Sequence, residues 1–247
     1  MPTYRDHAVV LRTHKLGEAD RIITLLSRSH GKLRAVARGV RRTSSKFGAR
    51  LEPFSHVDIQ LATGRNLDVV VQVASVDAFG QPMAADFARW TTGQVMVETA
   101  DRLVAEEREP ALQHYNLLLG ALRVLNQGTG DGPRPASMIL DAYLLRALAV
   151  AGWAASFTDC ARCGVVGPHQ GFSPAAGGVV CGRCRPSGSV NPSAATIGLL
   201  GSLLAGDWER TRDVPERVRR EASGLVAAFA AWHMERGLRS LAHVERA

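Results

Sequence analysis

The stretch Asp20-Arg-Ile-Ile-Thr-Leu-Leu-Ser-Arg-Ser-His-Gly-Lys-Leu-Arg-Ala-Val-Ala-Arg38 holds two short apolar runs on either side of a Ser-His-Gly turn. Side chains alternate between the two faces of a β-strand, so in the second run Leu33, Ala35 and Ala37 share one apolar face. The opposite face carries Lys32, Arg34, Val36 and Arg38. The pattern predicts a pair of strands, the second of which is buried on one side and basic on the other.

Three more runs of this kind bring the number of predicted strands in the first eighty residues to five. The five predicted strands span residues 7–12, 20–26, 32–38, 57–61 and 67–73. Their separators, such as Ala62-Thr63-Gly64-Arg65-Asn66, are rich in turn-forming residues. Five short strands that close on themselves indicate a small β-barrel. An OB-like barrel is the natural candidate, and the strand count leaves an SH3-like barrel open.

The periodicity becomes helical after Gly80-Gln81-Pro82, because apolar residues then recur at three- and four-residue spacing. The predicted helices span residues 85–107, 110–127, 135–152, 193–205 and 215 to about 241. The fold class is therefore α+β, with an N-terminal OB-like barrel followed by helices. We expect a barrel domain at residues 1–80, a helical domain at 81–156 and 189–247, and an inserted four-cysteine zinc ribbon at 157–188.

All four cysteines lie in two pairs, Cys160-Ala-Arg-Cys163 and Cys181-Gly-Arg-Cys184, separated by seventeen residues. This spacing is typical of a tetrahedral four-cysteine zinc site. Four sulfur ligands leave no open position for water, so we predict one structural zinc ion per chain, whose removal loosens residues 157–188. A redox dithiol or an iron–sulfur site is the alternative, but the sequence has neither the βαβ context nor the ferredoxin spacing that these require.

Positive charge is concentrated at the start of the chain. The formal net charge is +7, and the first eighty residues contain thirteen Lys or Arg against seven Asp or Glu. Eight basic residues and no acidic residue lie between Ser27 and Leu51. A field of one sign suits a polyanion such as nucleic acid, although the solvated face of a basic protein would have the same composition.

The basic strand 32–38 continues into a polar loop that ends near Phe47. This loop offers Arg and Lys charges together with hydroxyl donors, and both suit a phosphate backbone. Barrels of this class that bind single strands add stacking aromatics, for which Tyr4, Phe47 and Phe54 are candidates that fit a core equally well. Strong charge with weak stacking predicts binding that depends on salt and little on sequence.

An ordered set of motifs resembles the RecO family of DNA repair proteins. The motifs are Gly17-Glu18-Ala-Asp20-Arg21, Gly31-Lys32, Val36-Ala-Arg38-Gly39-Val-Arg41-Arg42-Thr-Ser-Ser45-Lys46-Phe47, Leu51-Glu-Pro53-Phe54, the two cysteine pairs and Glu235-Arg-Gly-Leu238-Arg-Ser240-Leu241. The resemblance covers essentially the whole chain. It implies an OB-fold, a helical domain and a zinc module in a DNA repair and recombination protein that binds single-stranded and double-stranded DNA and anneals complementary strands.

The resemblance also implies partners and contact residues. The expected partners are RecR, the C-terminal tail of single-strand binding protein and, indirectly, RecA, which the protein would help to load onto DNA together with RecR. The residues that match the basic motif, and are therefore predicted to contact DNA, are Lys32, Arg34, Arg38, Arg41, Arg42 and Lys46. Weaker candidates are Arg50 and Arg65. Near the cysteines, Arg162, Arg183 and Arg185 would either extend the DNA path or be solvated loop residues.

The sequence shows no catalytic constellation, so we predict a protein that is not an enzyme. The stretch Gly128-Thr-Gly-Asp-Gly132 lacks the lysine of a Walker loop, and Glu106-Glu107 is expected on a solvated helix end. Two alternatives stay open. A zinc-ribbon transcription regulator would prefer a duplex sequence to a single strand, and a metal-dependent nuclease would cleave DNA with magnesium or manganese.

Residues 1–20 contain no apolar core of a signal peptide, and no run approaches eighteen uninterrupted apolar residues. We therefore expect a cytoplasmic, nucleoid-associated protein without a membrane partner.

Overall fold

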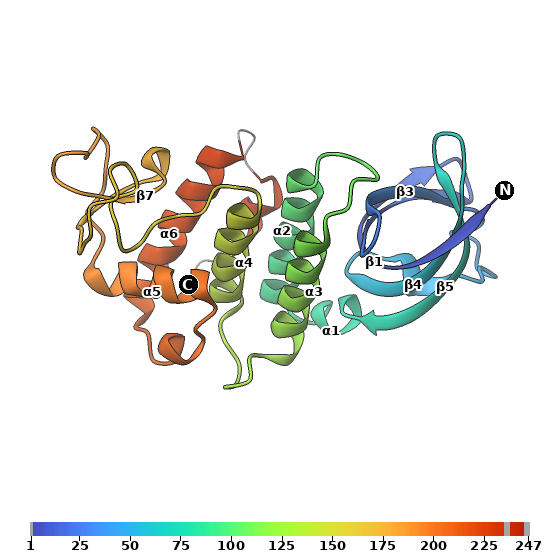
Figure 1. Ribbon diagram of the computed structural model, residues 1–247. Helices are drawn as coiled ribbons and strands as arrows, with labels where there is room; N and C mark the ends of the chain where they lie inside the picture. Colours follow the sequence, from blue (N-terminus) through green and yellow to red (C-terminus); the bar gives the residue numbers. More distant parts are fainter. Residues whose placement is uncertain (1, 235–237, 245–247) are drawn as a thin grey trace. The chain divides into compact units, whose positions relative to one another are not determined.

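The first of two compact units begins with a β-barrel. The computed structural model describes residues 2–234 and 238–244, and its contacts divide the chain into Met1–Asn126 and Gln127–Ala247. Figure 1 shows the strands of the first unit curving round to close on themselves. They are β1 (Thr3–Leu16), β2 (Asp20–Ser27), β3 (Gly31–Ala37), β4 (Ser55–Ala62) and β5 (Asp68–Ala78).

The strand order is that of an OB-fold. The strands follow one another round the barrel as β1-β2-β3-β5-β4, and β4 closes the circle by pairing with β1. Every pair is antiparallel except β3 with β5, which are parallel at two residue pairs, Ala35–Asp68 and Val36–Val69. This closed five-stranded order confirms the predicted fold class, and the parallel pair sets the barrel apart from the SH3-like alternative.

The predicted alternation along β3 is confirmed. Leu33, Ala35 and Ala37 are at most 1% exposed, and they join Ile23 and Leu25 of β2 in the barrel core. Burying a leucine side chain contributes about 1.5–3 kcal/mol, and a one-residue shift of register would move all three β3 residues to the surface. The apolar face of β3 therefore fixes the outward direction of its basic residues.

Two of the three aromatic residues considered for base stacking are core residues. Phe47 packs into the barrel core, and Phe54 makes an edge contact with Trp90 at 4.9 Å between ring centroids. Tyr4 is half-buried, and its hydroxyl donates to Asp68 at 2.5 Å. Phe47 and Phe54 therefore cannot stack on bases, and Tyr4 is engaged within the barrel.

Residues 104–111 correct the prediction of a helix over 85–107. After α1 (Gly80–Met83), α2 runs from Phe87 to Leu103, and the chain then follows the edge of β3 before α3 (Leu112–Gln127) begins. The amide of Arg108 donates to the carbonyl of Lys32 at 2.9 Å, and Lys32 forms a parallel bridge with Glu107. Glu106-Glu107 therefore lies beside a strand and not on a helix end. The reason is that β5 pairs with only two residues of β3, so the rest of that edge accepts other backbone partners.

Three helices that pack against one another and a small hairpin form the second unit. They are α4 (Ala136–Val150), α5 (Ala194–Ala205), α6 (Glu216–His233) and the strands β6 (Gly171–Ser173) and β7 (Gly178–Val180). Short 3₁₀ helices lie at Gly48–Leu51 in the first unit and at Pro174–Ala176, Glu209–Thr211 and Ser240–His243 in the second. The helix predicted to reach residue 241 ends at His233, and residues 235–237 of that prediction, with the matching part of the Glu235–Leu241 motif, lie outside the described residues.

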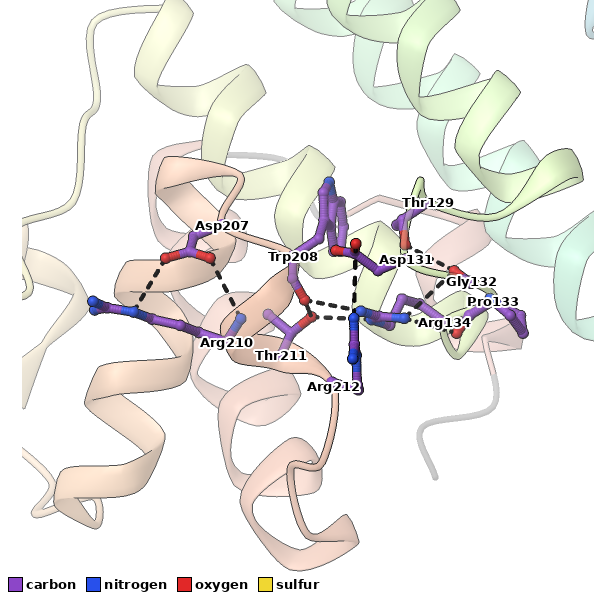
Figure 2. A network of polar contacts seen from close by, with 10 residues as sticks. All are labelled: Thr129, Asp131, Gly132, Pro133, Arg134, Asp207, Trp208, Arg210, Thr211 and Arg212. Atoms are coloured by element: carbon purple, nitrogen blue, oxygen red, sulfur yellow. Dashed lines mark hydrogen bonds and ion pairs between the residues drawn. The ribbon is translucent and has the colours of Figure 1, made fainter.

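Arg134 fixes the loop before α4 to the segment before α6. Its guanidinium donates to the carbonyl of Trp208 at 2.9 Å, to the hydroxyl of Thr211 at 3.2 Å and to the carbonyl of Pro133 at 3.2 Å (Figure 2). Multiple hydrogen bonds from one planar cation are well suited to joining two irregular segments. Arg134 therefore has a structural role in the second unit.

Gly31 is predicted to be essential for the contact between β3 and residues 104–111. It has a φ of +66°, and a Cβ placed on it would lie 1.7 Å from the carbonyl oxygen of Glu109. We expect Gly31→Ala to lower the free energy of unfolding by at least about 3 kcal/mol in urea titrations, from left-handed strain plus a displaced backbone. Gly17→Ala is the control, because Gly17 has a φ of +58° with open space around it, and it should cost only about 1 kcal/mol. Equal losses would contradict the contact.

Candidate nucleic-acid interface and metal site

Two exposed arginines, Arg38 and Arg42, lie in the loop that follows β3. Arg38 directly follows β3, and Arg42 lies four residues further on, in the turn that leads towards β4. Both side chains are exposed, and neither has a hydrogen-bond or ion-pair partner within residues 2–234 and 238–244. An unpaired guanidinium group presents a planar set of donors that matches phosphate geometry.

The loop that carries these residues is tied to the turn between β1 and β2. The amide of Gly39 donates to the carboxylate of Asp20 at 2.7 Å. The guanidinium of Arg41 donates to the carbonyl of Glu18 at 2.7 Å. Arg41 is therefore both an exposed charge and a support for the loop, so its replacement would disturb structure as well as charge.

Three further cations of the barrel are Lys46 and Arg50, in the segment between β3 and β4, and Arg65, between β4 and β5. The ammonium of Lys46 donates to the carbonyl of Val71 at 3.0 Å and lies 5.1 Å from the ring centroid of Phe47. Arg50 donates to the carbonyls of Lys46 and Phe47. Arg65 is exposed, in the turn between β4 and β5, and has no side-chain partner in the described part of the chain. Lys46 and Arg50 thus stabilise the loop while their charges remain near the surface.

Lys32 and Arg34 project from the same face of β3, but both are paired with carboxylates. The ammonium of Lys32 donates to the carbonyl of Asp101 at 2.9 Å and lies 3.5 Å from its carboxylate. Arg34 forms an ion pair with Glu107 at 2.5 Å. Asp101 also pairs with Arg12 of β1 at 2.9 Å. The sequence correctly predicts that these cations point outward, whereas the structure places them against acidic groups that are distant in sequence.

Asp68 is the residue that holds this arrangement in place. Its side chain is fully buried, and it accepts hydrogen bonds from the hydroxyl of Tyr4, from the amide of Gly64 and from Arg108 at 2.7 Å. Burial alone would raise the pKa of this carboxyl, but the three hydrogen bonds outweigh it and lower the pKa below the ordinary value of 3.8. Asp68 therefore remains ionised and anchors Arg108 beside β3.

Sequence reasoning missed Asp68, Glu107 and Arg108. The signal available was the acidic run Glu106-Glu107-Arg108-Glu109 just before Pro110, where a helix would have to end. Asp68 lies 40 residues before Arg108 in the chain and Arg34 lies 73 residues before Glu107, so no local pattern connects them. These residues bear on the candidate interface because they decide which of the barrel's cations are already paired.

The four cysteines come together in the second unit. Their sulfur atoms all lie within 4.8 Å of one another, and the Sγ atoms of Cys163 and Cys181 are 3.8 Å apart. Four thiolates at about 2.3 Å from one zinc ion would have sulfur atoms about 3.8 Å apart. The cluster therefore fits a tetrahedral metal ion, and the described cysteines can hold one.

The backbone around the cysteines favours the thiolate form of Cys160. The amide of Cys181 donates to the Sγ of Cys160 at 3.4 Å, and this hydrogen bond lowers the pKa of the Cys160 thiol to about 6. Cys184 donates its thiol proton to the neighbouring Cys163 and Cys181 sulfurs, which favours its neutral form and raises its pKa to about 12. The nearby Cys160 thiolate adds a smaller conflict between like charges. A bound metal ion would remove this conflict by supplying the missing positive charge.

The arginines near the cysteines are solvent-exposed. Arg162 and Arg183 lie inside the two Cys-x-x-Cys turns, and neither has a side-chain partner among the residues placed by the structure. Arg185 donates to the carbonyl of Ser189 at 3.2 Å. Their exposure agrees with a solvated loop as well as with a DNA contact, so they add no separate argument for either role.

Comparison with known proteins identifies the family. The profile described as "Recombination protein O N terminal" matches residues 1–79, and the one described as "Recombination protein O C terminal" matches residues 84–242. The chain belongs to the RecO family. It is 63% identical over 246 residues to the DNA repair protein RecO of Cutibacterium acnes, with 100% of each chain covered. It is 56% identical over 246 residues to the DNA repair protein RecO of Nocardioides sp., covering 98% of this chain and 99% of that protein.

RecO membership confirms the resemblance predicted from the motifs and assigns the chain to DNA repair and recombination. Among the described residues, no helix combines the length and the apolar character that a membrane span requires. The OB barrel and the four-cysteine cluster are thus parts of a RecO-family protein.

Asp68 is predicted to stabilise the first unit in a pH-dependent manner. Because its pKa is depressed in the folded state, its contribution is complete above the ordinary value of 3.8 and is lost as the pH falls through the folded pKa. We expect Asp68→Asn to lose at least about 2 kcal/mol of unfolding free energy at pH 7, and the difference from wild type to shrink in acid. Urea titrations at several pH values measure both effects.

The matched control for Asp68→Asn is Asp58→Asn. Asp58 pairs with Arg5 at 2.6 Å, but the Arg5 side chain is 71% exposed. Removing this surface pair should cost less than about 1 kcal/mol. A loss at position 58 as large as that at position 68 would contradict the anchoring role of Asp68.

Removing one thiol is predicted to abolish metal binding without loss of the barrel. We expect about one zinc ion per wild-type chain and almost none in Cys181→Ser, because three thiolates leave the shell incomplete. Elemental analysis with thiol titration measures this. Arg183→Ala, in the same turn, should keep its metal. Wild-type protein with four titratable thiols and no zinc would disprove the prediction.

Proposed function

We propose that this RecO-family protein binds single-stranded DNA on its OB barrel, anneals complementary strands and serves as a mediator of homologous recombination. The observation that carries the proposal is the exposure of Arg38 and Arg42 at the end of β3, where neither guanidinium group has a partner among the residues that the structure describes. Arg41 and Lys46 extend the positive surface from the same loop. Barrels of this class bind single strands in a basic groove across their strands.

Charge, and not stacking, is expected to dominate this binding. Phe47 and Phe54 are buried, so the first unit offers a phosphate-binding surface with few aromatic platforms. Binding should then weaken steeply with salt and depend little on base sequence. The same surface would hold double-stranded DNA through its phosphates after annealing.

Annealing by this route requires no enzymatic chemistry. Two phosphate backbones repel one another, and cations that neutralise both strands lower this repulsion, while base pairing supplies the driving force. We therefore propose a protein that acts without hydrolysing ATP or cleaving DNA.

The four cysteines are proposed to hold one structural zinc ion. A complete sulfur shell has no position for a water nucleophile, so the metal would stabilise residues 157–188 without catalysing a reaction. We propose this module as an insertion in a helical domain made of residues 81–156 and 189–247, which follows an OB domain at residues 1–80.

The proposed partners follow from RecO-family membership. They are RecR, the C-terminal tail of single-strand binding protein and, through these, RecA, which would be loaded onto covered single strands. A protein that works on chromosomal DNA in this way would act in the cytoplasm, in association with the nucleoid.

Replacing Arg38 and Arg42 together by Gln is predicted to weaken single-strand binding about tenfold or more at 0.1 M salt, because two phosphate contacts are lost. The slope of log affinity against log salt should become shallower by about one to two. Fluorescence anisotropy with a labelled dT oligonucleotide measures both, and strand annealing without ATP should fall in parallel.

The control carries two substitutions of the same kind in α6, Arg217→Gln and Arg220→Gln, which remove equal charge from the second unit. It should bind and anneal like wild type. If the control loses binding to a duplex while Arg38→Gln/Arg42→Gln does not, a duplex-reading regulator is favoured. DNA cleavage with magnesium or manganese would favour a nuclease.

A further inference from the structure

Three basic side chains on one face of the barrel form ion pairs with acidic groups of the same chain. Arg12 and Lys32 share the carboxylate of Asp101, which lies in α2. Arg34 is paired with Glu107, in the segment that follows α2. The register of the sheet places Arg12 and Arg34 on either side of Thr24, so these cations come from neighbouring strands. The carboxylates lie where a phosphate backbone crossing β1, β2 and β3 would have to pass.

The segment of residues 105–109, called the acidic segment here, is held on β3 by its backbone and by one anchor. Arg108 donates its amide to Lys32 and its guanidinium to the buried carboxylate of Asp68. Arg108 has a φ of +66°, a strained backbone conformation for a residue other than glycine, which is maintained by these two contacts. The absence of a side chain on Gly31 allows the carbonyl of Glu109 to approach the strand closely.

The carboxylates of Asp101 and Glu107 differ in how readily a phosphate group could replace them. The Asp101 side chain is 16% exposed and the Lys32 side chain 12%, so this pair is largely shielded from solvent. The Glu107 and Arg34 side chains are 38% and 43% exposed, so water and salt reach this pair. A phosphate could therefore replace the carboxylate of Glu107 while the backbone of the acidic segment stays anchored through Arg108.

We propose that Glu107 is a built-in competitor of the DNA phosphate for Arg34, and that the acidic segment thereby limits the DNA affinity of the barrel. The inference rests on the proposed single-strand binding by Arg38 and Arg42, and it adds an internal restraint to that site. Arg38 and Arg42 are free to meet DNA first. Arg34 joins the interface only when Glu107 is displaced, while Lys32 and Arg12 remain with Asp101.

This competition has a functional consequence for annealing. A protein that anneals strands must release its product, and a phosphate contact that competes with an internal carboxylate is weaker than one made by a free cation. The acidic segment would thus keep the barrel from holding DNA too tightly without reducing the number of cations on its surface.

The test is single-strand affinity of the full-length chain across a salt series, with Glu107→Gln as the variant and labelled dT oligonucleotide as the probe. Glu107→Gln removes the competitor and should tighten binding about three- to tenfold at 0.1 M salt. The slope of log affinity against log salt concentration should become steeper by about 0.7, because one more phosphate contact forms. Adding Arg34→Gln to it should abolish the gain. Arg34→Gln alone should change wild-type affinity less than about twofold, since Arg34 is already occupied.

Glu106→Gln is the matched control. Glu106 is the exposed neighbour of Glu107, with the same charge but no side-chain partner among the described residues. Its replacement should change affinity less than about twofold and leave the slope unaltered, because only the overall field changes. Thermal unfolding of each variant confirms that the fold is retained.

Equal gains in Glu106→Gln and Glu107→Gln would overturn the inference, since net charge alone would explain them. Weaker binding by Glu107→Gln would overturn it as well. A failure of the proposed function looks different: Arg38→Gln/Arg42→Gln would bind like wild type, or the wild type would not bind single strands at all.

Discussion

Asp68, whose carboxylate is buried, joins four parts of the first unit. It accepts hydrogen bonds from Tyr4 in β1, from the turn between β4 and β5, and from Arg108 beyond α2. Its backbone forms the parallel pair with Ala35 that closes the barrel between β3 and β5. A buried charge of this kind is tolerated only when it is fully hydrogen-bonded, so its partners are held in defined positions. The position of the acidic segment on β3, and with it the pairing of Arg34, depends on this one group.

The electrostatic character of the barrel follows from how its cations are paired and not from their number. The first eighty residues contain thirteen Lys or Arg, but several of these form ion pairs with carboxylates or hydrogen bonds with carbonyls of the same chain. Only unpaired cations contribute a full phosphate contact when DNA arrives, because the others must first lose an internal partner. Among the cations without partners in the described part of the chain, Arg38 and Arg42 lie four residues apart at the end of β3, so they are the strongest candidates for first contact.

The sequence was sufficient for features that depend on local pattern. Alternation from Leu33 to Ala37 correctly predicted which face of β3 is buried, and the spacing of Cys160, Cys163, Cys181 and Cys184 correctly predicted that they cluster. Features that depend on contacts between residues distant in the chain could not be predicted from the sequence. The pairing of β3 with β5 and the pairing of Lys32 with Asp101 each join residues 33 or more positions apart. The end of α2 at Leu103 follows from another such contact, between β3 and the residues after this helix. Tertiary contact thus overrode helical propensity at residues 104–107.

Hydrogen–deuterium exchange of the 247-residue chain, purified in the presence of zinc, with and without a dT oligonucleotide tests the central claim most directly, because it reports where DNA covers the backbone. If the open end of β3 is the DNA site, the amides of residues 38–46 become protected in the complex, and those of residues 160–185 exchange as in the free protein. Protection confined to the cysteine module, with unchanged exchange at residues 38–46, would contradict the account.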